Sequence, residues 1–395
     1  MQAVILAAGE GTRLRPLTDM MSKPMIPIAN KPILEWTVDI LSDICDDIII
    51  VVRENQKDII EHFQNFSHCR FAIQEEALGT GNAVACSEKL IRDRFIVING
   101  DEMITKMDIR KLSKLDGYHI GAFEVSDPEK FGVLDIRDGL VKNIDEKPQN
   151  PKGNLVNTGL YLVDKKIFDS IRRTPKSARN EYEFTDALIN MIEDGLELKP
   201  FILGRWVTIT YPWHILEANQ LVLDQFGSFI GKNVDIRSGT HIEHPVAIGD
   251  NAILGPNCFI RKYSVIGKGC KVGNAVEIKN SIIMDNTFVS HLSYVGDTII
   301  GRNCNIAAGT IFANLRLDEK NIGMNHVGKT IDSGRRKLGG IVGDNVKFGV
   351  NCVVMPGKKI WPNILVPPCR IIDKDIEEQP DLKNWKGEVR EGYSD

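Results

Sequence analysis

The C-terminal half of the chain carries an apolar residue at every sixth position. The beat runs through 230–284, then through 282–312 in a second register that includes Phe288 and Tyr294, and it resumes in the same phase at 342–372. A helix would repeat its apolar positions about every 3.6 residues and an ordinary strand every two. We therefore expect a parallel β-helix, in which each of these side chains points inward and stacks on its equivalent in the preceding coil.

The N-terminal half alternates short apolar runs with amphipathic segments. The pattern predicts strands at 3–8, 47–52, 71–74 and 95–98, with helices at 32–43, 56–66 and 80–91. This βαβ rhythm is typical of a Rossmann-like, mostly parallel sheet with helices on both faces. Ligands of such sheets bind at the C-terminal ends of the strands.

These patterns divide the chain into an α/β domain at 1–225 and a β-helix domain at 226–375, joined by a helix near 213–226. Residues 313–341 interrupt the six-residue beat without shifting its phase, so we expect them to leave the prism as a loop. Residues 376–395 are polar and charged, which predicts an arm or a frayed tail.

Composition excludes several classes of partner. The 395 residues carry a net charge of −4, which argues against a nucleic-acid surface. No run approaches the roughly 20 apolar residues that span a bilayer, so we expect no membrane partner. The eight cysteines form no Cys-x-x-Cys pair. This argues against a zinc site and predicts free thiols in the cytoplasm.

A glycine loop follows the first expected strand and contains Gly9 and Gly11, with Arg13 and Lys23 shortly after it. Glycines let backbone N–H groups approach phosphate oxygens, and the two cations add positive charge. Leu14 replaces the third glycine of a dinucleotide-binding fingerprint, and no Gly-Lys-Ser/Thr follows at P-loop spacing. A plain tight turn after a buried strand is the alternative.

The run 6–17 with Lys23-Pro24 resembles the signature of sugar-1-phosphate nucleotidylyltransferases. In that family the loop holds a nucleoside triphosphate, and Arg13 and Lys23 would act in catalysis by neutralising charge around the α-phosphorus and pyrophosphate. Residues 74–81 resemble the base loop, which favours uracil or thymine. The nucleotide-binding residues implied by the resemblance are Leu6, Ala8, Gly9, Gly11, Gln74, Gly79 and Thr80.

Later motifs follow the same family in order. Asp101 in Ile98–Asp101 matches its Mg²⁺ ligand. The implied sugar-phosphate residues of this domain are Gly132, Glu146, Lys147, Asn157 and Glu183. One departure concerns the family's Trp-x-Asp-x-Gly-x-Pro motif, where Thr208 replaces the second metal carboxylate and Thr210 the glycine. Mg²⁺ tolerates one or two carboxylates beside phosphate and water, although a hydroxyl is a poorer ligand.

The β-helix half resembles the bifunctional N-acetylglucosamine-1-phosphate uridylyltransferase/glucosamine-1-phosphate acetyltransferases, especially the archaeal type. The matching segments are 255–261, 273–279, 291–297 and 305–310, together with Asn314. The resemblance implies His291 as general base, Tyr294 as a positioning group, and Asn305 and Asn314 as residues that hold the amino sugar and polarise the thioester. Arg261 and Lys279 would grip the sugar phosphate. By residue type alone, His291 would more often be a surface side chain.

The excursion ends in a basic stretch, 333–338, and the implied acetyl-CoA-binding residues are Ala308 and Lys337. A solvated basic loop is the alternative for this stretch. The family places such sites between neighbouring prisms of a trimer, so a homotrimer is implied, and the resemblance also implies left-handed coiling of the prism.

We therefore expect acetyl transfer from acetyl-CoA to glucosamine-1-phosphate, followed by Mg²⁺-dependent uridylyl transfer from UTP. One alternative is acetyl transfer alone, with Thr208 impairing the first domain. Another is a non-catalytic regulatory subunit. The sequence leaves open whether galactosamine-1-phosphate or TTP is also used.

Overall fold

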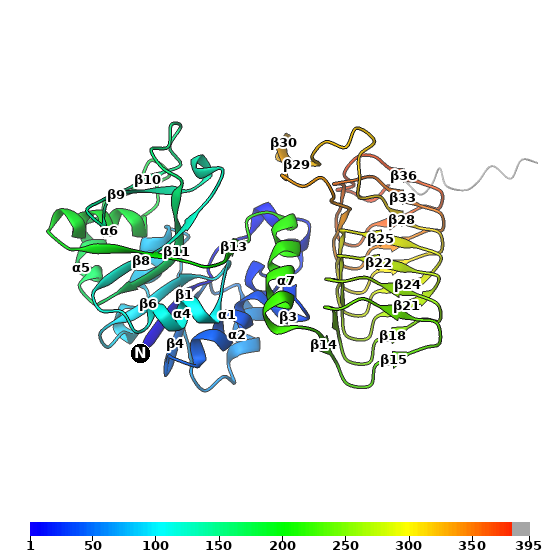
Figure 1. Cartoon of the computed structure of the whole chain (residues 1–395), viewed down its shortest axis with the longest axis horizontal. Coiled ribbons are helices and arrows are strands. Elements are labelled where there is room, and N and C mark those ends of the chain that lie inside the picture. The colour runs from blue at the N-terminus through cyan, green and yellow to red at the C-terminus, as the bar shows by residue number, and fades with distance from the viewer. Residues whose placement is uncertain (381–395) are drawn as a thin grey trace, which may run out of the picture. The chain divides into compact units, whose positions relative to one another are not determined.

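The computed structural model describes residues 1–380 and divides the chain into two compact units (Figure 1). The first comprises Met1–Gly11, Ser22–Ile26 and Lys31–Ile209, and the second Thr12–Met21, Pro27–Asn30 and the chain from Thr210 onward. No helix in the described part is long and apolar enough to cross a membrane. The part of the expected tail beyond residue 380 lies outside the described residues.

The first unit is built on a nine-stranded sheet in the order β10-β9-β11-β6-β1-β4-β5, with β8 pairing β11 and β12. The strands are β1 (Gln2–Leu6), β4 (Asp47–Val52), β5 (Cys69–Ile73), β6 (Phe95–Asn99), β8 (Tyr118–Glu124), β9 (Gly132–Arg137), β10 (Leu140–Glu146), β11 (Leu155–Val163) and β12 (Leu198–Ile202). Strands β6, β1, β4 and β5 run parallel, which confirms the Rossmann-like expectation, and β11 runs antiparallel to β6.

Helices cover both faces of this sheet (Figure 1). Successive residues of β1 enter different clusters: Ile5 packs in the cluster that contains Val38, and Val4 in the one that contains Phe184. The α-helices are α1 (Ile33–Ser42), α2 (Lys57–Phe63), α3 (Thr80–Ala85), α4 (Lys106–Leu112), α5 (Ile167–Arg173) and α6 (Phe184–Glu193). Side chains therefore alternate between two buried faces, as a strand of period two requires.

Shorter elements complete this half of the chain. Strands β7 (Glu102–Ile104) and β13 (Trp206–Thr208) pair antiparallel, with Thr208 opposite Glu102. The others are β2 (Pro27–Ile28), β3 (Lys31–Pro32) and the 3-10 helices η1 (Thr12–Leu14), η2 (Leu17–Asp19), η3 (Lys23–Met25), η4 (Glu88–Leu90) and η5 (Pro128–Lys130).

The second unit continues with α7 (Pro212–Phe226) into a left-handed parallel β-helix whose three faces are seven-stranded parallel sheets (Figure 1). One face holds β14 (Phe229–Ile230), β17 (Ala247–Ile248), β20 (Val265–Ile266), β23 (Ile282–Ile283), β26 (Ile299–Ile300), β31 (Ile341–Val342) and β34 (Lys359–Ile360). The second face holds β15 (Asp235–Ile236), β18 (Ile253–Leu254), β21 (Lys271–Asn274), β24 (Phe288–His291), β27 (Asn305–Ile306), β32 (Lys347–Phe348) and β35 (Leu365–Val366). The third face holds β16 (His241–Ile242), β19 (Phe259–Ile260), β22 (Glu277–Lys279), β25 (Tyr294–Gly296), β28 (Ile311–Phe312), β33 (Val353–Val354) and β36 (Ile371–Ile372).

The prediction that Phe288 and Tyr294 point into the prism is wrong. The buried residues of this coil are Val289 and Val295, whereas Phe288 is 43% exposed. The beat shortens by one residue at two corners, because the stacked inward positions run 278, 283, 289, 295, 300. Since successive strand residues face opposite sides, this one-residue shift turns Phe288 and Tyr294 outward.

The excursion leaves the prism between β28 and β31 and contains an antiparallel hairpin, β29 (Gly323–His326) and β30 (Lys329–Asp332). The prism resumes in register, since Phe312 still pairs with Val354 in the next coil. Beyond the last strand, Ile376 still bridges to Ile360, so the chain stays on the prism past residue 375.

Candidate functional site

In the first unit, the glycine loop leaves the C-terminal end of β1. The Ala7 N–H donates to the Val51 carbonyl at 2.9 Å, and the buried Gln56 amide donates to the Ala7 carbonyl at 3.0 Å. Gly9 is exposed, and an added Cβ there would meet nothing within 4 Å. The loop is therefore anchored on one side and open on the other, as a backbone that receives phosphate must be.

The neighbouring loop residues differ in exposure. Ala8 is buried and Leu6 half-buried, so their side chains belong to the core and their backbone would serve the ligand. Gly11 has φ of +68°, a conformation that glycine adopts without strain. Lys23 forms an ion pair with Asp101 inside the first unit. Arg13 belongs to the second unit, where it lines a small pocket that also includes His326.

The expected base-recognition residue, Gln74, is buried at the end of β5. Its Nε2 donates to the Gly79 carbonyl at 3.1 Å and to Asn82 Oδ1 at 2.9 Å. Both amide hydrogens are therefore used, and Oε1 is left as an acceptor. Gly79 has φ of +98°, and a Cβ there would lie 2.7 Å from the Tyr182 carbonyl oxygen. The Thr80 hydroxyl accepts from the Phe184 N–H at 3.0 Å and so anchors the start of α6.

The expected sugar residues lie around β9, β10 and β11. Asn157 is held on both sides of its amide, since its Nδ2 donates to the Tyr161 hydroxyl at 2.7 Å and its Oδ1 accepts from the Gly159 N–H at 3.0 Å. Gly132 makes room for Glu146, because a Cβ at Gly132 would lie 3.1 Å from Glu146 Oε2. Burial raises the pKa of Tyr161. The Tyr161 hydroxyl therefore stays protonated and fixes Asn157.

The remaining two sugar residues are charged. Lys147 Nζ lies 3.6 Å from Glu146 Oε1, and both side chains are exposed. Glu183 is mostly buried and accepts from Arg179 at 2.9 Å and from the Ser177 hydroxyl at 3.1 Å. These contacts tie the Glu183 carboxylate to Arg179 and Ser177, so Glu183 stabilises the loop that precedes α6.

The candidate metal ligand, Asp101, directly precedes β7, the strand that pairs with β13. The Glu102 carboxylate is buried and accepts from Trp206 Nε1 at 2.6 Å and from the Thr208 hydroxyl at 3.1 Å. Burial and then the charge of Asp101 raise the pKa of Glu102 well above its usual range. Within residues 1–380, no three His, Cys, Asp or Glu side chains gather as a metal cage. An oxygen set of Asp101 with phosphate and water still fits Mg²⁺, which rarely uses an all-protein cage.

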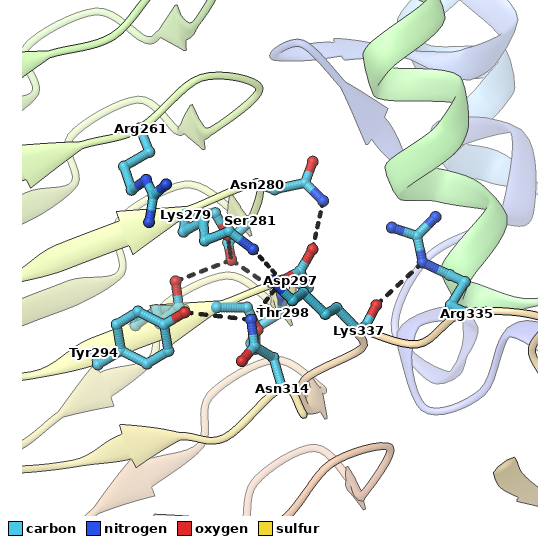
Figure 2. Close-up of polar contacts among 12 residues, drawn as sticks. Arg261, Lys279, Asn280, Ser281, Tyr294, Asp297, Thr298, Asn314, Arg335 and Lys337 are labelled. Carbon is cyan, nitrogen blue, oxygen red and sulfur yellow. Dashed lines mark hydrogen bonds and ion pairs between the residues drawn. The ribbon is translucent and has the colours of Figure 1, made fainter. Parts of the chain in front are cut away.

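In the second unit, several expected acetyltransferase residues meet on the third face of the prism (Figure 2). The Asn314 amide donates to the Tyr294 hydroxyl at 3.2 Å and to Asp297 Oδ2 at 2.5 Å. Lys279 Nζ lies 2.9 Å from the same carboxylate oxygen. Burial and the nearby Asp297 charge raise the pKa of Tyr294, so its hydroxyl stays neutral. Arg261 lies one coil away.

Arg261 is paired with acidic neighbours. Its guanidinium contacts Glu277 at 3.1 Å and Glu243 at 3.6 Å. These are exposed pairs of modest strength, so the guanidinium remains able to meet a phosphate.

His291 and Asn305 lie elsewhere on the prism. His291 ends β24 on the second face, is exposed, and its ring makes no hydrogen bond to any residue that the structure describes. Asn305 is an exposed residue of the next strand on that face, aligned with Phe288. Tyr294 belongs to the third face. Within the described residues, one chain therefore gathers Lys279, Tyr294 and Asn314 but brings neither His291 nor Asn305 into the same hydrogen-bonded cluster.

Two of the three cations at the basic end of the excursion form ion pairs within the described residues. Arg335 donates to Glu217 of α7 at 3.1 Å, and Arg336 forms an ion pair with Glu319. The exposed Lys337 ammonium has no acidic partner among the described residues. Ala308 is half-buried, and its carbonyl accepts from the Asn351 N–H at 2.8 Å.

Sequence reasoning gave no role to Gln56, Glu102 or Asp297. Gln56 lies in a helical segment with no motif, so the sequence carried no signal for it. Asp297 lay within the matched segment 291–297, and Glu102 follows the matched Asp101. For these two acids, the available signal was an acidic residue within or directly after a matched motif.

Comparisons with known proteins show the family to which the chain belongs. A nucleotidyl transferase family model matches residues 2–225, and a GMPPB C-terminal domain model matches 242–369. The bifunctional protein GlmU of Methanocaldococcus jannaschii is 42% identical, over 95% of this chain and 96% of that protein. A bifunctional sugar-1-phosphate nucleotidylyltransferase/acetyltransferase of Sulfurisphaera tokodaii is 35% identical over 95% and 98%.

A solved structure resembles part of the chain. It is a Bacillus anthracis protein described as a candidate glucose-1-phosphate thymidylyltransferase, with a TM-score of 0.52 and 29% identity over 57% of this chain and 96% of that one. The fold and the sites thus define a nucleotidyl transferase joined to a left-handed β-helix. Because its relatives match over nearly their whole length, the chain belongs to the family of bifunctional GlmU proteins.

Proposed function

We propose that the protein makes UDP-N-acetylglucosamine in two steps: acetylation of glucosamine-1-phosphate by acetyl-CoA, then uridylyl transfer from UTP to the product. The observation that carries this proposal is the presence in one chain of an open glycine loop with the Lys23–Asp101 pair and of the Lys279–Tyr294–Asn314 cluster. A phosphorylated amino sugar is the ligand that both sites would share.

In the acetyl-transfer step, His291 takes a proton from the ammonium of the amino sugar. The free amine then attacks the thioester carbonyl, the C–S bond breaks, and coenzyme A leaves with a proton. Lys279 and Arg261 hold the sugar phosphate, while Tyr294 and Asn314 orient the amino sugar. The exposed His291 ring makes no hydrogen bond to any described residue, so it is free to take up the proton as a general base. Lys337 and the Ala308 backbone would meet coenzyme A.

In the nucleotidyl step, a phosphate oxygen of the sugar attacks the α-phosphorus of UTP and the bond to pyrophosphate breaks. Backbone N–H groups around Gly9 and Gly11 hold the triphosphate, and Lys23 and Arg13 offset the charge of two reacting anions. The sugar hydroxyls would contact Asn157, Glu146 and Glu183, with Lys147 at the sugar phosphate. These roles agree with the open face of the loop at Gly9.

The preference for uracil is supported by Gln74. Because its amide hydrogens are both used within the loop, its Oε1 can only accept. The N3–H of uracil or thymine is a donor, as is the N1–H of guanine, whereas N3 of cytosine and N1 of adenine are acceptors. TTP therefore remains a possible second substrate by this criterion.

Asp101 would hold Mg²⁺ together with triphosphate oxygens and water. The ion would supply positive charge to the reacting phosphates. Lys23, which contacts Asp101, would share that task and keep the carboxylate oriented toward the phosphates.

We also propose that the protein is a cytoplasmic homotrimer. The eight unpaired cysteines fit a reducing compartment. Two adjacent faces of the prism expose apolar side chains, including Phe288, Leu292 and Ile311. A neighbouring prism packed there would cover them and could bring its Asn305-bearing face to the Tyr294-bearing face.

Two assays test the proposal. Purified protein with UTP, Mg²⁺ and N-acetylglucosamine-1-phosphate should release pyrophosphate, and with acetyl-CoA and glucosamine-1-phosphate it should release free thiol. Thiol release without pyrophosphate release would favour an acetyltransferase whose first domain is impaired at Thr208. The absence of both reactions would favour a regulatory subunit.

A further inference from the structure

Asp297 is a buried carboxylate that joins the residues of the acetyl-transfer cluster. Its side chain is 4% exposed and accepts hydrogen bonds from three side chains (Figure 2). Oδ2 accepts from Lys279 Nζ at 2.9 Å and from Asn314 Nδ2 at 2.5 Å, and Oδ1 accepts from Asn280 Nδ2 at 2.7 Å. All its side-chain partners are donors, as an ionised carboxylate requires.

The backbone around Asp297 is fixed as firmly as the side chain. Its N–H donates to the Lys279 carbonyl at 2.8 Å, and its carbonyl accepts from the Gly339 N–H at 2.8 Å, where the excursion returns to the prism. The preceding glycine leaves room for this cluster, because a Cβ at Gly296 would lie 2.6 Å from both Asn314 Nδ2 and the Tyr294 hydroxyl and would displace them. The carboxylate therefore has little freedom to move.

This arrangement decides which way the Asn314 amide faces. Both Nδ2 hydrogens are directed at acceptors, one at Asp297 and one at the Tyr294 hydroxyl. A carboxylate cannot donate, so the amide cannot turn over without placing two oxygens against each other. Asn314 thus offers Oδ1 to a ligand, which can accept a hydrogen from an amino group but cannot donate to a thioester carbonyl.

We propose that Asp297 is a positioning residue for acetyl transfer: it holds Lys279 in place and fixes Asn314 with its amide oxygen toward the substrate. This inference rests on the proposed acetyltransferase function. It narrows the expected role of Asn314, which orients the amino group and leaves polarisation of the thioester to other groups. Asp297 itself touches no substrate in this scheme.

The competing explanation is that Asp297 only stabilises a turn of the prism. The chain offers a control of similar burial, Asp344, whose carboxylate is 6% exposed at a different corner of the prism. It accepts from the Arg302 backbone N–H at 2.8 Å and from the Arg302 guanidinium at 2.5 Å. Asp344 lies on the first face, beside β31, and has no contact with Lys279, Tyr294 or Asn314 among the described residues.

The test compares Asp297→Asn with Asp344→Asn in the full-length enzyme. An asparagine at position 297 has one acceptor oxygen, whereas three side chains donate to Asp297, so Asn314 or Lys279 loses its hydrogen bond to this residue. We expect kcat for thiol release from acetyl-CoA with glucosamine-1-phosphate to fall at least 30-fold in Asp297→Asn, with KM for acetyl-CoA within threefold and pyrophosphate release unchanged. Asp344→Asn should lower Tm by a similar amount and leave kcat within threefold.

An exchange variant separates orientation from folding. In Asp297→Asn with Asn314→Asp, the residue at position 314 again presents an acceptor to the amino group, and we expect at least a tenfold recovery of kcat over the single variant. If Asp297→Asn keeps kcat within threefold of wild type, or if the exchange gives no recovery, the inference is wrong. Should the single variant not fold, the exchange variant decides alone, and kcat below one hundredth of wild type would refute the positioning role. A wild type that does not acetylate would refute the proposed function instead.

Discussion

Thr208→Asp is the most informative single change in the nucleotidyl half. The substitution restores the carboxylate that related motifs carry, but the structure shows what it would face: the Thr208 hydroxyl lies 3.1 Å from Glu102 Oε1, across the β7–β13 pair. The change removes a hydrogen-bond donor to Glu102 and places a second carboxylate there. Two unit charges 3.1 Å apart would repel by about 5 kcal/mol at an effective dielectric constant of about 20, and this is an upper limit, because the raised pKa of Glu102 lets a proton offset part of the repulsion.

That repulsion can be relieved by a divalent cation. We therefore expect Thr208→Asp to have a lower Tm than wild type in EDTA and to regain most of the difference in millimolar Mg²⁺, while the wild type changes little. The Mg²⁺ concentration for half-maximal pyrophosphate release should fall, because a hard anionic ligand is added beside Asp101. Thiol release in the acetyl-transfer assay should stay the same.

Two controls make the result interpretable. Thr208→Asn has nearly the same shape without the charge and should show no Mg²⁺-dependent rise in Tm. Thr208→Asp combined with Glu102→Gln should remove the loss of stability in EDTA. If Thr208→Asp has an unchanged metal requirement and no Mg²⁺-dependent change in Tm, then position 208 does not reach the metal, and another group completes that site.

Four further substitutions test three separate parts of the proposal. His291→Ala should lower acetyl transfer by about 10²–10⁴-fold and spare pyrophosphate release; a loss below tenfold would exclude His291 as the base. Lys23→Ala and Arg13→Ala should each depress pyrophosphate release at least tenfold and leave thiol release intact, whereas equal losses in both assays would indicate misfolding. Gly296→Ala should lower kcat of acetyl transfer at least tenfold by displacing Asn314, since the new Cβ would lie 2.6 Å from its amide; unchanged kcat would show that the cluster tolerates the shift.

The architecture was predictable because its signals are periodic and long. The βαβ alternation identified the parallel strands of the first unit, and β4 was predicted residue for residue as 47–52. The six-residue beat identified the prism, since each coil buries the same positions. The inward register around 282–300 was not predictable from the beat, because each position offers two adjacent apolar residues, such as Phe288 and Val289.

Candidate site residues could be named from the sequence where a motif is contiguous, as at the glycine loop and at 291–297, and their roles stay predictions. They were not predictable where two segments meet only in the fold. Glu102 and Thr208 face each other through the β7–β13 pair, and no spacing in the sequence indicates this. Gln74 was expected to recognise a base, but the hydrogen bonds that reduce it to an acceptor depend on Gly79 and Asn82.

The two corners that are one residue short, at 278–283 and 295–300, also shape the acetyl-transfer cluster. In an unshortened corner, two residues separate the strand-end Arg261 from the buried Ser264. At the two shortened corners a single residue does so, Asn280 before Ser281 and Asp297 before Thr298, and both of these single residues have positive φ, 45° and 48°. The corners stack in adjacent coils, since Lys279 pairs with Gly296. At each shortened corner a polar side chain lies against an adjacent coil, and in this way Asp297 reaches Asn280 and Lys279 of the preceding coil at hydrogen-bonding distance. The two shortened corners interrupt the six-residue repeat and thereby create a local polar site on an otherwise uniform prism.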